Sequence, residues 1–331
     1  MLTTLSIPCI FTALADDFFK RGKERIIFVN TAPVALLLSI SLAAALGRNI
    51  IVRNYSRRDG LTNADVHFFN AVSALLSALV LLIWGGFGTI SLFTLLCGIA
   101  FGLTVGFQNL FFLRALALGP WSYTTVIVSL SSLITTLSGA VFWHESITVV
   151  QWIGIACMVG CSVLSVGNRG GTIADCKRSQ TVRWLLTSLL AFLLNGLLGL
   201  TQKLHQSSTH REELGAFLIV AFGVLFAYST VLWGVSAFRG GHGSGAVSSA
   251  MTPMWLVWLA VGGVLQAVNH KLNLYLSGVM DSAVFFPIVN GGGLVLTTLL
   301  AVTLFREQLD GRQWVGLILG IVSVVLVCNP F

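Results

Sequence analysis

Long apolar runs alternate with short polar segments along almost the whole chain. A helix needs about 20 predominantly apolar residues to cross the hydrocarbon core of a bilayer, and ten runs of about this length can be drawn in the sequence. We therefore expect an all-α integral membrane protein with ten transmembrane helices. The expected spans are residues 33–52, 68–87, 90–113, 120–143, 147–166, 183–202, 214–238, 253–276, 282–305 and 313–328.

The composition agrees with a bilayer environment. Of the 331 residues, 56% are hydrophobic and only 9% are charged, whereas an ordinary soluble domain carries roughly 25% charged residues. This excludes a soluble globule, a disordered chain and a small disulfide scaffold. The net charge of +7 lies mostly between the apolar runs, which is typical of membrane-flanking charges and does not indicate nucleic-acid binding. The six cysteines have no paired metal spacing, so we expect no disulfide, metal or cofactor.

The N-terminal segment, positions 1–30, does not fit the pattern of spans. The apolar stretch at 5–15 is too short to cross a bilayer and is followed by charged residues at 16–25. A signal peptide is one interpretation, but no positive residue precedes the apolar stretch, as that interpretation requires. We therefore expect an interfacial or disordered tail over residues 1–30.

An internal repeat is visible when the chain is compared with itself. A shift of 149 positions aligns the first two spans with spans six and seven, and a shift of 162 aligns spans four and five with spans nine and ten. The difference of 13 corresponds to an insertion near the glycine-rich segment at 239–245. Identical pairs are Leu36 and Leu185, Gly47 and Gly196, Trp84 and Trp233, Glu145 and Glu307, Trp152 and Trp314, and Gly154 and Gly316.

The repeat predicts two five-helix units, at 31–167 and 183–329, joined by a polar linker at 168–182. Because five is odd, the second unit must enter the membrane from the opposite face, which gives an inverted-topology repeat. Such repeats support alternating access, although duplication of a membrane scaffold remains an alternative. Ten spans place both termini on one side of the membrane; the positive-inside rule and the resemblance described below disagree on which side.

Two sets of motifs carry a family resemblance. The first half contains Arg114-Ala-Leu-Ala-Leu-Gly-Pro120, Phe142-Trp-His-Glu145 and Gln151-Trp-Ile-Gly154, and the second half contains Leu304-Phe-Arg-Glu307 and Gln313-Trp-Val-Gly316. In these motifs the sequence resembles EamA-like members of the drug/metabolite transporter superfamily. The resemblance implies a ten-helix transporter whose cavity is lined by spans one, three, four, six, eight and nine. Asp281-Ser282 departs from the pattern, because the first half has Gly119-Pro120 there.

Polar residues inside the expected spans are the candidates for substrate binding, since such residues are costly in lipid unless they are paired or face water. They lie on spans three, four, six, eight and nine. The candidates are Gln108, Asn109, Ser129, Ser132, Asn195, Gln266, Asn269, His270, Lys271 and Asn290.

Each candidate has a structural alternative. The ammonium of Lys271 attracts an anionic group of the cargo if it faces a cavity, or extends to the headgroups from its place near the end of span eight. The amides could equally be hydrogen-bonding contacts between helices.

Two carboxylates and a glycine run are structural or hinge candidates. Glu145 and Glu307 occupy equivalent positions after spans four and nine, where each can cap the next helix or pair with a nearby base. Gly291, Gly292 and Gly293 weaken span nine, because each glycine costs roughly 1 kcal/mol in a helix relative to alanine. The run therefore either bends the span or admits a neighbouring helix.

The sequence thus predicts a secondary transporter and no enzyme. The expected cargo is a small polar or amphipathic metabolite of amino-acid-like, nucleotide-related or drug-like type, with proton coupling, counter-substrate coupling and homodimer formation as open alternatives. The protein is expected in the plasma membrane, and its expected partners are the lipid bilayer and the small-molecule cargo. A passive channel or ion transporter and a non-transporting scaffold are the other interpretations, although no continuous ring of charge is visible in the sequence.

Overall fold

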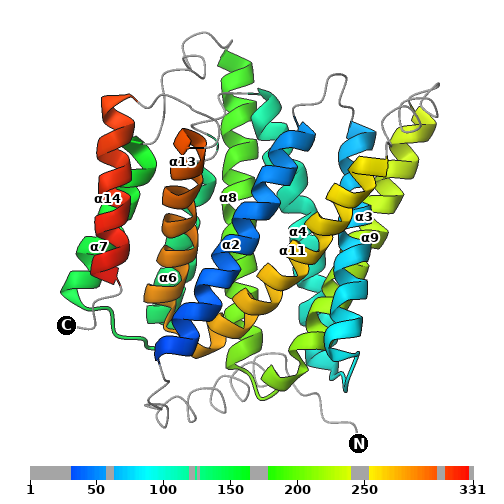
Figure 1. The fold of residues 1–331 in the computed structure, drawn as a ribbon, viewed down its shortest axis with the longest axis horizontal. Coiled ribbons are helices and arrows are strands. Elements are labelled where there is room, and N and C mark those ends of the chain that lie inside the picture. Colours follow the sequence, from blue (N-terminus) through cyan, green and yellow to red (C-terminus); the bar gives the residue numbers. More distant parts are fainter. Residues whose placement is uncertain are drawn as a thin grey trace, which may run out of the picture.

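The computed structural model describes residues 31–56, 63–118, 124, 127–164, 178–239, 253–303 and 310–327, and the regular structure in these ranges is helical (Figure 1). The tail expected at 1–30 lies outside them. The elements are α2 (Thr31–Ser56), α3 (Asn63–Gly85), α4 (Leu92–Leu118), α6 (Ser132–Phe142), α7 (Val149–Leu164), α8 (Arg178–Ser207), η3 (Arg211–Glu213), α9 (Leu214–Arg239), α11 (Pro253–Val279), α12 (Ser282–Pro287), the π-helix η4 (Ile288–Gly292), α13 (Gly293–Thr303) and α14 (Gly311–Val327).

The helices have the length and character of membrane spans. Within the described ranges, 5 helices are long and apolar enough to cross a bilayer, and shorter apolar helices accompany them. Many large apolar side chains point outward; Ile83, for example, is 87% exposed and Val149 is 75% exposed. An outer surface of this kind is stable in lipid and not in water. The expectation of an all-α membrane protein is confirmed.

Two spans differ from their expected form. Span six is longer at both ends: α8 begins at Arg178, inside the expected linker, and continues to Ser207. Span nine is interrupted, because α12 ends at Pro287 and the π-helix η4 precedes α13. Proline lacks the N–H that an α-helix needs, and Gly291 and Gly292 then lie in the wider π turn. A break in regular helix therefore lies where the glycine run predicted a weak point.

Helices distant in sequence form the main contacts of the bundle. α3 packs against α9, and α7 packs against α14. α4 lies against both α8 and α9, whereas α11 lies against both α2 and α3. In Figure 1, α7 and α14 stand at one end of the bundle and α3 and α9 at the other.

A glycine stripe on α4 brings that helix close to α9. A β-carbon on Gly98 would lie 2.9 Å from the carbonyl oxygen of Phe217, one on Gly102 would overlap the carbonyl oxygen of Ala221, and one on Gly106 would lie 2.7 Å from the ring of Tyr228. The regular i, i+4 spacing places all three glycines on one helix face. Small residues at this spacing allow two transmembrane backbones to approach closely.

We predict that Gly102→Ala lowers the free energy of unfolding of the detergent-solubilised protein by about 1–3 kcal/mol, and with it the melting temperature. The reason is that the added methyl group forces α4 away from α9. Gly223→Ala on α9 is the matched control, since a β-carbon there meets nothing within 4 Å; it should leave stability unchanged or raise it by up to about 1 kcal/mol. Equal melting temperatures for the two variants would contradict the close approach.

Candidate functional site

The polar candidates on α11 contact different neighbouring helices. The Asn269 side-chain amide donates to the carbonyl oxygen of Ser41 on α2 at 3.0 Å. The Ser41 hydroxyl donates to Oδ1 of Asn273 at 2.7 Å, and Nδ2 of Asn273 reaches Oδ1 of Asn269 at 3.4 Å. Asn269 therefore takes part in a hydrogen-bonded contact between α2 and α11, which is one of the two roles considered for it.

Gln266 and His270 lie one helical turn apart on α11, and the His270 ring contacts helices other than α2. The His270 ring makes edge contacts with Phe101 of α4 and Phe222 of α9, at centroid distances of 6.0 Å and 5.4 Å. Oε1 of Gln266 and Nδ1 of His270 are both buried and have no hydrogen-bond partner among the described residues. Buried polar atoms are almost always hydrogen-bonded. These two atoms therefore differ from the side-chain amide of Asn269, which is hydrogen-bonded to α2.

The ammonium group of Lys271 makes a cation–π contact with an aromatic ring. Its Nζ lies 4.0 Å from the centroid of the Trp84 ring, close to the end of α3 at Gly85. Trp84 is 49% exposed. A cation placed over an indole ring is stabilised by the ring quadrupole, and this position favours the interpretation in which the lysine extends toward the end of the bundle.

The candidates on α6 and α8 form a separate group. Nδ2 of Asn195 on α8 donates to Oγ of Ser131 at 2.6 Å, joining α8 to the start of α6. The Ser129 and Ser162 hydroxyls are 3.4 Å apart, and the Ser132 hydroxyl donates to the carbonyl oxygen of Ser129. Among the described residues, no hydrogen bond joins this group to the candidates on α11.

Three other candidates make no hydrogen bond to another helix side chain in the described ranges. Gln108 and Asn109 on α4 are partly buried, and neither amide is bonded to another described residue. Asn290 of η4 donates to the carbonyl oxygen of Phe286, at the end of the preceding α12, at 3.0 Å. A β-carbon on the neighbouring Gly291 would lie 3.1 Å from Met158 of α7, so close packing accompanies the π turn there.

Glu145 is held in a buried ion pair, one of the two roles expected for it, with a base that the sequence did not identify. Its Oε1 lies 2.7 Å from Nζ of Lys203, with the two side chains only 11% and 8% exposed. Nζ also donates to the carbonyl oxygen of Met280 at 3.0 Å, and the backbone N–H of Ser282 donates to Oε2 of Glu145 at 2.7 Å. The pair thus joins the turn after α6, the end of α8 and the start of α12. Glu307, the repeat equivalent, lies outside the described residues.

The backbone before Glu145 directs it toward these partners. His144 has a φ of 52°, a left-handed conformation that is uncommon for a residue with a side chain. The N–H groups of Trp143 and Glu145 both donate to the carbonyl oxygen of Gly139, which ends α6 and reverses the chain. Nearby, partial desolvation and the Glu145 carboxylate raise the pKa of Asp281, against the opposing effect of Lys203.

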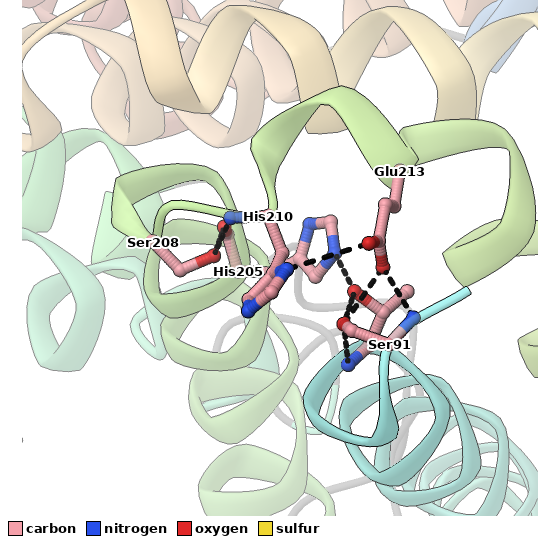
Figure 2. Close-up of polar contacts among 6 residues, drawn as sticks. Ser91, His205, Ser208, His210 and Glu213 are labelled. Atoms are coloured by element: carbon pink, nitrogen blue, oxygen red, sulfur yellow. Dashed lines mark hydrogen bonds and ion pairs between the residues drawn. The ribbon is translucent and has the colours of Figure 1, made fainter. Parts of the chain in front are cut away.

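A second polar cluster, shown in Figure 2, braces the start of α4. Oε2 of Glu213 accepts hydrogen bonds from the backbone N–H and the hydroxyl of Ser91 at 2.9 Å and 2.8 Å, and Oε1 lies 3.3 Å from Nδ1 of His210. The fully buried His205 contacts the Thr94 hydroxyl at 3.2 Å. Sequence reasoning missed this cluster; the only signal was the grouping of these charged residues between spans six and seven.

Metal binding finds no support in the described part of the chain, where no group of three or more His, Cys, Asp or Glu side chains is arranged to hold an ion. The chemistry present there consists of hydrogen bonds, one buried ion pair and cationic side chains. An arrangement of this kind can recognise and orient a polar solute.

The fold and these polar groups define an α-helical integral membrane protein. Residues 30–167 match the sequence profile of the EamA-like transporter family, so this part of the chain is an EamA-like unit of the drug/metabolite transporter superfamily, as the motifs indicated. Members of this family are transporters and not enzymes. No curated protein matches the chain. A solved structure described only as "Crystal structure of protein" is similar in fold, with a TM-score of 0.66 at 16% sequence identity, and the match covers 88% of this chain and 97% of that one.

We predict that Glu145→Gln destabilises the protein by about 3 kcal/mol, because it leaves the buried ammonium of Lys203 without its counter-ion. The double variant Glu145→Gln/Lys203→Met should recover most of this loss, since no buried charge then remains. Arg211→Gln is the control: Arg211 and Glu212 form an exposed pair at 3.7 Å, and its loss should change stability by less than about 1 kcal/mol. Thermal unfolding in detergent measures all three, and a double variant no more stable than Glu145→Gln would refute the assignment.

Proposed function

We propose that this protein is a secondary transporter that moves a small polar or amphipathic metabolite across the plasma membrane by alternating access between two inverted five-helix repeats. The observation that carries the proposal is the symmetry of the helix packing under exchange of the repeats. The two halves of the sequence are aligned by the shifts of 149 and 162 positions. Under these shifts α2 is equivalent to α8, α3 to α9, α4 to α11, and α7 to α14.

The helix contacts are preserved under this exchange. α2 packs against α11, and the exchanged pair, α8 and α4, is also in contact. α3 packs against α11, and the exchanged pair, α9 and α4, is also in contact. The pairs that exchange with themselves, α3 with α9 and α7 with α14, are in contact as well. This is the pattern expected when two copies of one unit surround a pseudo-two-fold axis.

Equivalent atoms repeat the symmetry between α7 and α14. A β-carbon on Gly154 would lie 3.2 Å from the carbonyl oxygen of Ser323, and one on Gly316 would lie 3.2 Å from that of Cys161. The longer of the two shifts converts Gly154 into Gly316 and Cys161 into Ser323. The contacts run in opposite directions along the two helices, so α7 and α14 are antiparallel. Repeats related by an axis in the membrane plane have this relationship.

The buried ion pair has a role in this mechanism. Glu145 belongs to the first repeat, whereas Lys203 and Ser282 belong to the second, so their contacts cross the boundary between the repeats. Alternating access proceeds by movement of one repeat against the other. Contacts across the boundary at one end of the bundle must therefore break when that end opens, and we assign the Glu145–Lys203 pair as such a closing contact.

Inverted topology predicts that equivalent positions lie on opposite sides of the membrane. Thr148 and Asp310 precede α7 and α14 and are equivalent under the longer of the two shifts. With the six natural cysteines replaced, Thr148→Cys and Asp310→Cys should each react with an impermeant maleimide from one side only, and from opposite sides. Labelling of both from the same side would refute the inverted repeat.

Uptake into proteoliposomes tests the transport function itself. Pools of amino acids, nucleosides and organic acids are offered outside, and the vesicle contents are measured by mass spectrometry against protein-free vesicles. We expect uptake that saturates with concentration. Uptake should also be faster when the same compound is present inside the vesicles, because the binding site can then return to the outside with solute bound. Uptake without saturation would indicate a channel, and no protein-dependent uptake would indicate a scaffold.

A further inference from the structure

Arg48 lies on the buried face of α2, and its position was not singled out by the repeat, the motifs or the family resemblance. Residues on the same face are buried: Ser41, Ala44, Ile51 and Tyr55 all lie inside the bundle and recur at intervals of three or four. This face points at α11, because Ser41 bonds Asn269 and a β-carbon on Gly262 would lie 3.6 Å from Ile51. Arg48 therefore faces α11 between these two contacts.

The charge of Arg48 is not balanced by any neighbour that the structure describes. Within the described ranges the partly buried side chain makes no ion pair and no hydrogen bond, and the surrounding helices remove part of the water from its guanidinium group. A charged side chain inside a membrane costs several kcal/mol unless it is paired, extends to the headgroups or faces water, and unpaired ones often mark the pathway of a solute. In contrast, Lys203 has Glu145 and Lys271 has Trp84.

Two further groups, whose buried atoms are unpaired among the described residues, lie on α11, the helix that Arg48 faces. The guanidinium is near enough to His270 to act on it electrostatically, and His270 and Gln266 carry the buried atoms without partners described above. Helical side chains lean toward the N-terminus of their helix, which brings the Arg48 guanidinium away from the end of α2 and toward the middle of the bundle. Substrate sites of transporters with inverted repeats lie near the bilayer midplane, toward which this side chain is directed.

We propose that Arg48, Gln266 and His270 bind an anionic group of the transported solute, a carboxylate or a phosphate. The guanidinium presents parallel N–H donors that match the paired oxygens of either group. Nδ1 of His270 can donate to an oxygen of the anion in the tautomer that carries its proton there, and Oε1 of Gln266 can accept from a hydroxyl or amino group beside the anion. The proposal rests on the transport function proposed above, and it narrows the cargo to organic anions.

Thermal unfolding in the presence of simple anions tests the site without knowledge of the natural cargo. The purified protein is titrated at constant ionic strength with phosphate, lactate and glutamate, and with choline and glucose as cationic and neutral comparisons. A solute that binds the folded state raises the melting temperature in a saturable manner. We expect such a rise for at least one of the anions and for neither choline nor glucose.

Variants of Arg48 locate the effect. Arg48→Met should abolish the anion-dependent rise while leaving the melting temperature without solute unchanged or higher, since an unpaired charge is removed. Arg48→Lys keeps the charge but loses the paired donors, so the apparent affinity should fall by about tenfold or more. Arg183→Met is the matched control, because Arg183 is an exposed arginine near the start of α8, and it should respond to anions like the unaltered protein.

The outcomes separate this inference from the transport function. An anion response that persists in Arg48→Met would overturn the inference, as would saturable uptake of cationic or neutral compounds with no response to any of the anions; the transport proposal would survive both. If Arg48→Met does not fold, Arg48→Lys decides, and an affinity equal to that of the unaltered protein would overturn the site. Absence of any saturable uptake would overturn the transport function as well.

Discussion

Lipid tails solvate a leucine side chain as well as another leucine does, so apolar contact alone does not hold transmembrane helices together. The bundle depends instead on close approach of backbones at small residues. Gly98, Gly102 and Gly106 bring α4 onto α9, and Gly154 and Gly316 bring α7 onto α14. These contacts give dispersion attraction over many atoms at once. They also determine which helix faces are turned inward, and hence where the polar side chains lie.

Polar groups inside the bundle fall into two classes once their partners are counted. Asn269, Asn195 and Glu145 each bond to a neighbouring helix, so their desolvation is compensated within the protein. In the described part of the chain, Gln266 and His270 have buried atoms without partners, and Arg48 has no ion-pair or hydrogen-bond partner. A buried group left unpaired costs free energy, and a solute can supply what the protein does not. The second class is therefore better suited to binding than the first.

The sequence was informative about features that depend on local composition. The apolar runs predicted the all-helical membrane fold, the short motifs predicted the family, and the glycine run after Pro287 predicted a weak point where the π-helix now lies. Features that depend on distant neighbours were not predictable. Nothing local to Glu145 distinguishes Lys203 from other bases, and nothing local to Lys271 indicates Trp84. Arg48 lies inside the first expected span, but the sequence alone did not show that it occupies the face of α2 that is turned toward α11.

The two ends of the proposed inverted repeat differ in charge, and this bears on the resting state of the transporter. At one end Glu145 of the first repeat meets Lys203 of the second. The two shifts convert this pair into Glu307 and Asn54, so an acid is kept while the base is replaced by a neutral amide. An equivalent contact at the opposite end would lack a charge pair. Breaking a buried pair is costly because each charge is left uncompensated. In the proposed mechanism the empty protein therefore favours closure at the Glu145 end, and binding energy from the solute must offset this difference before that end opens.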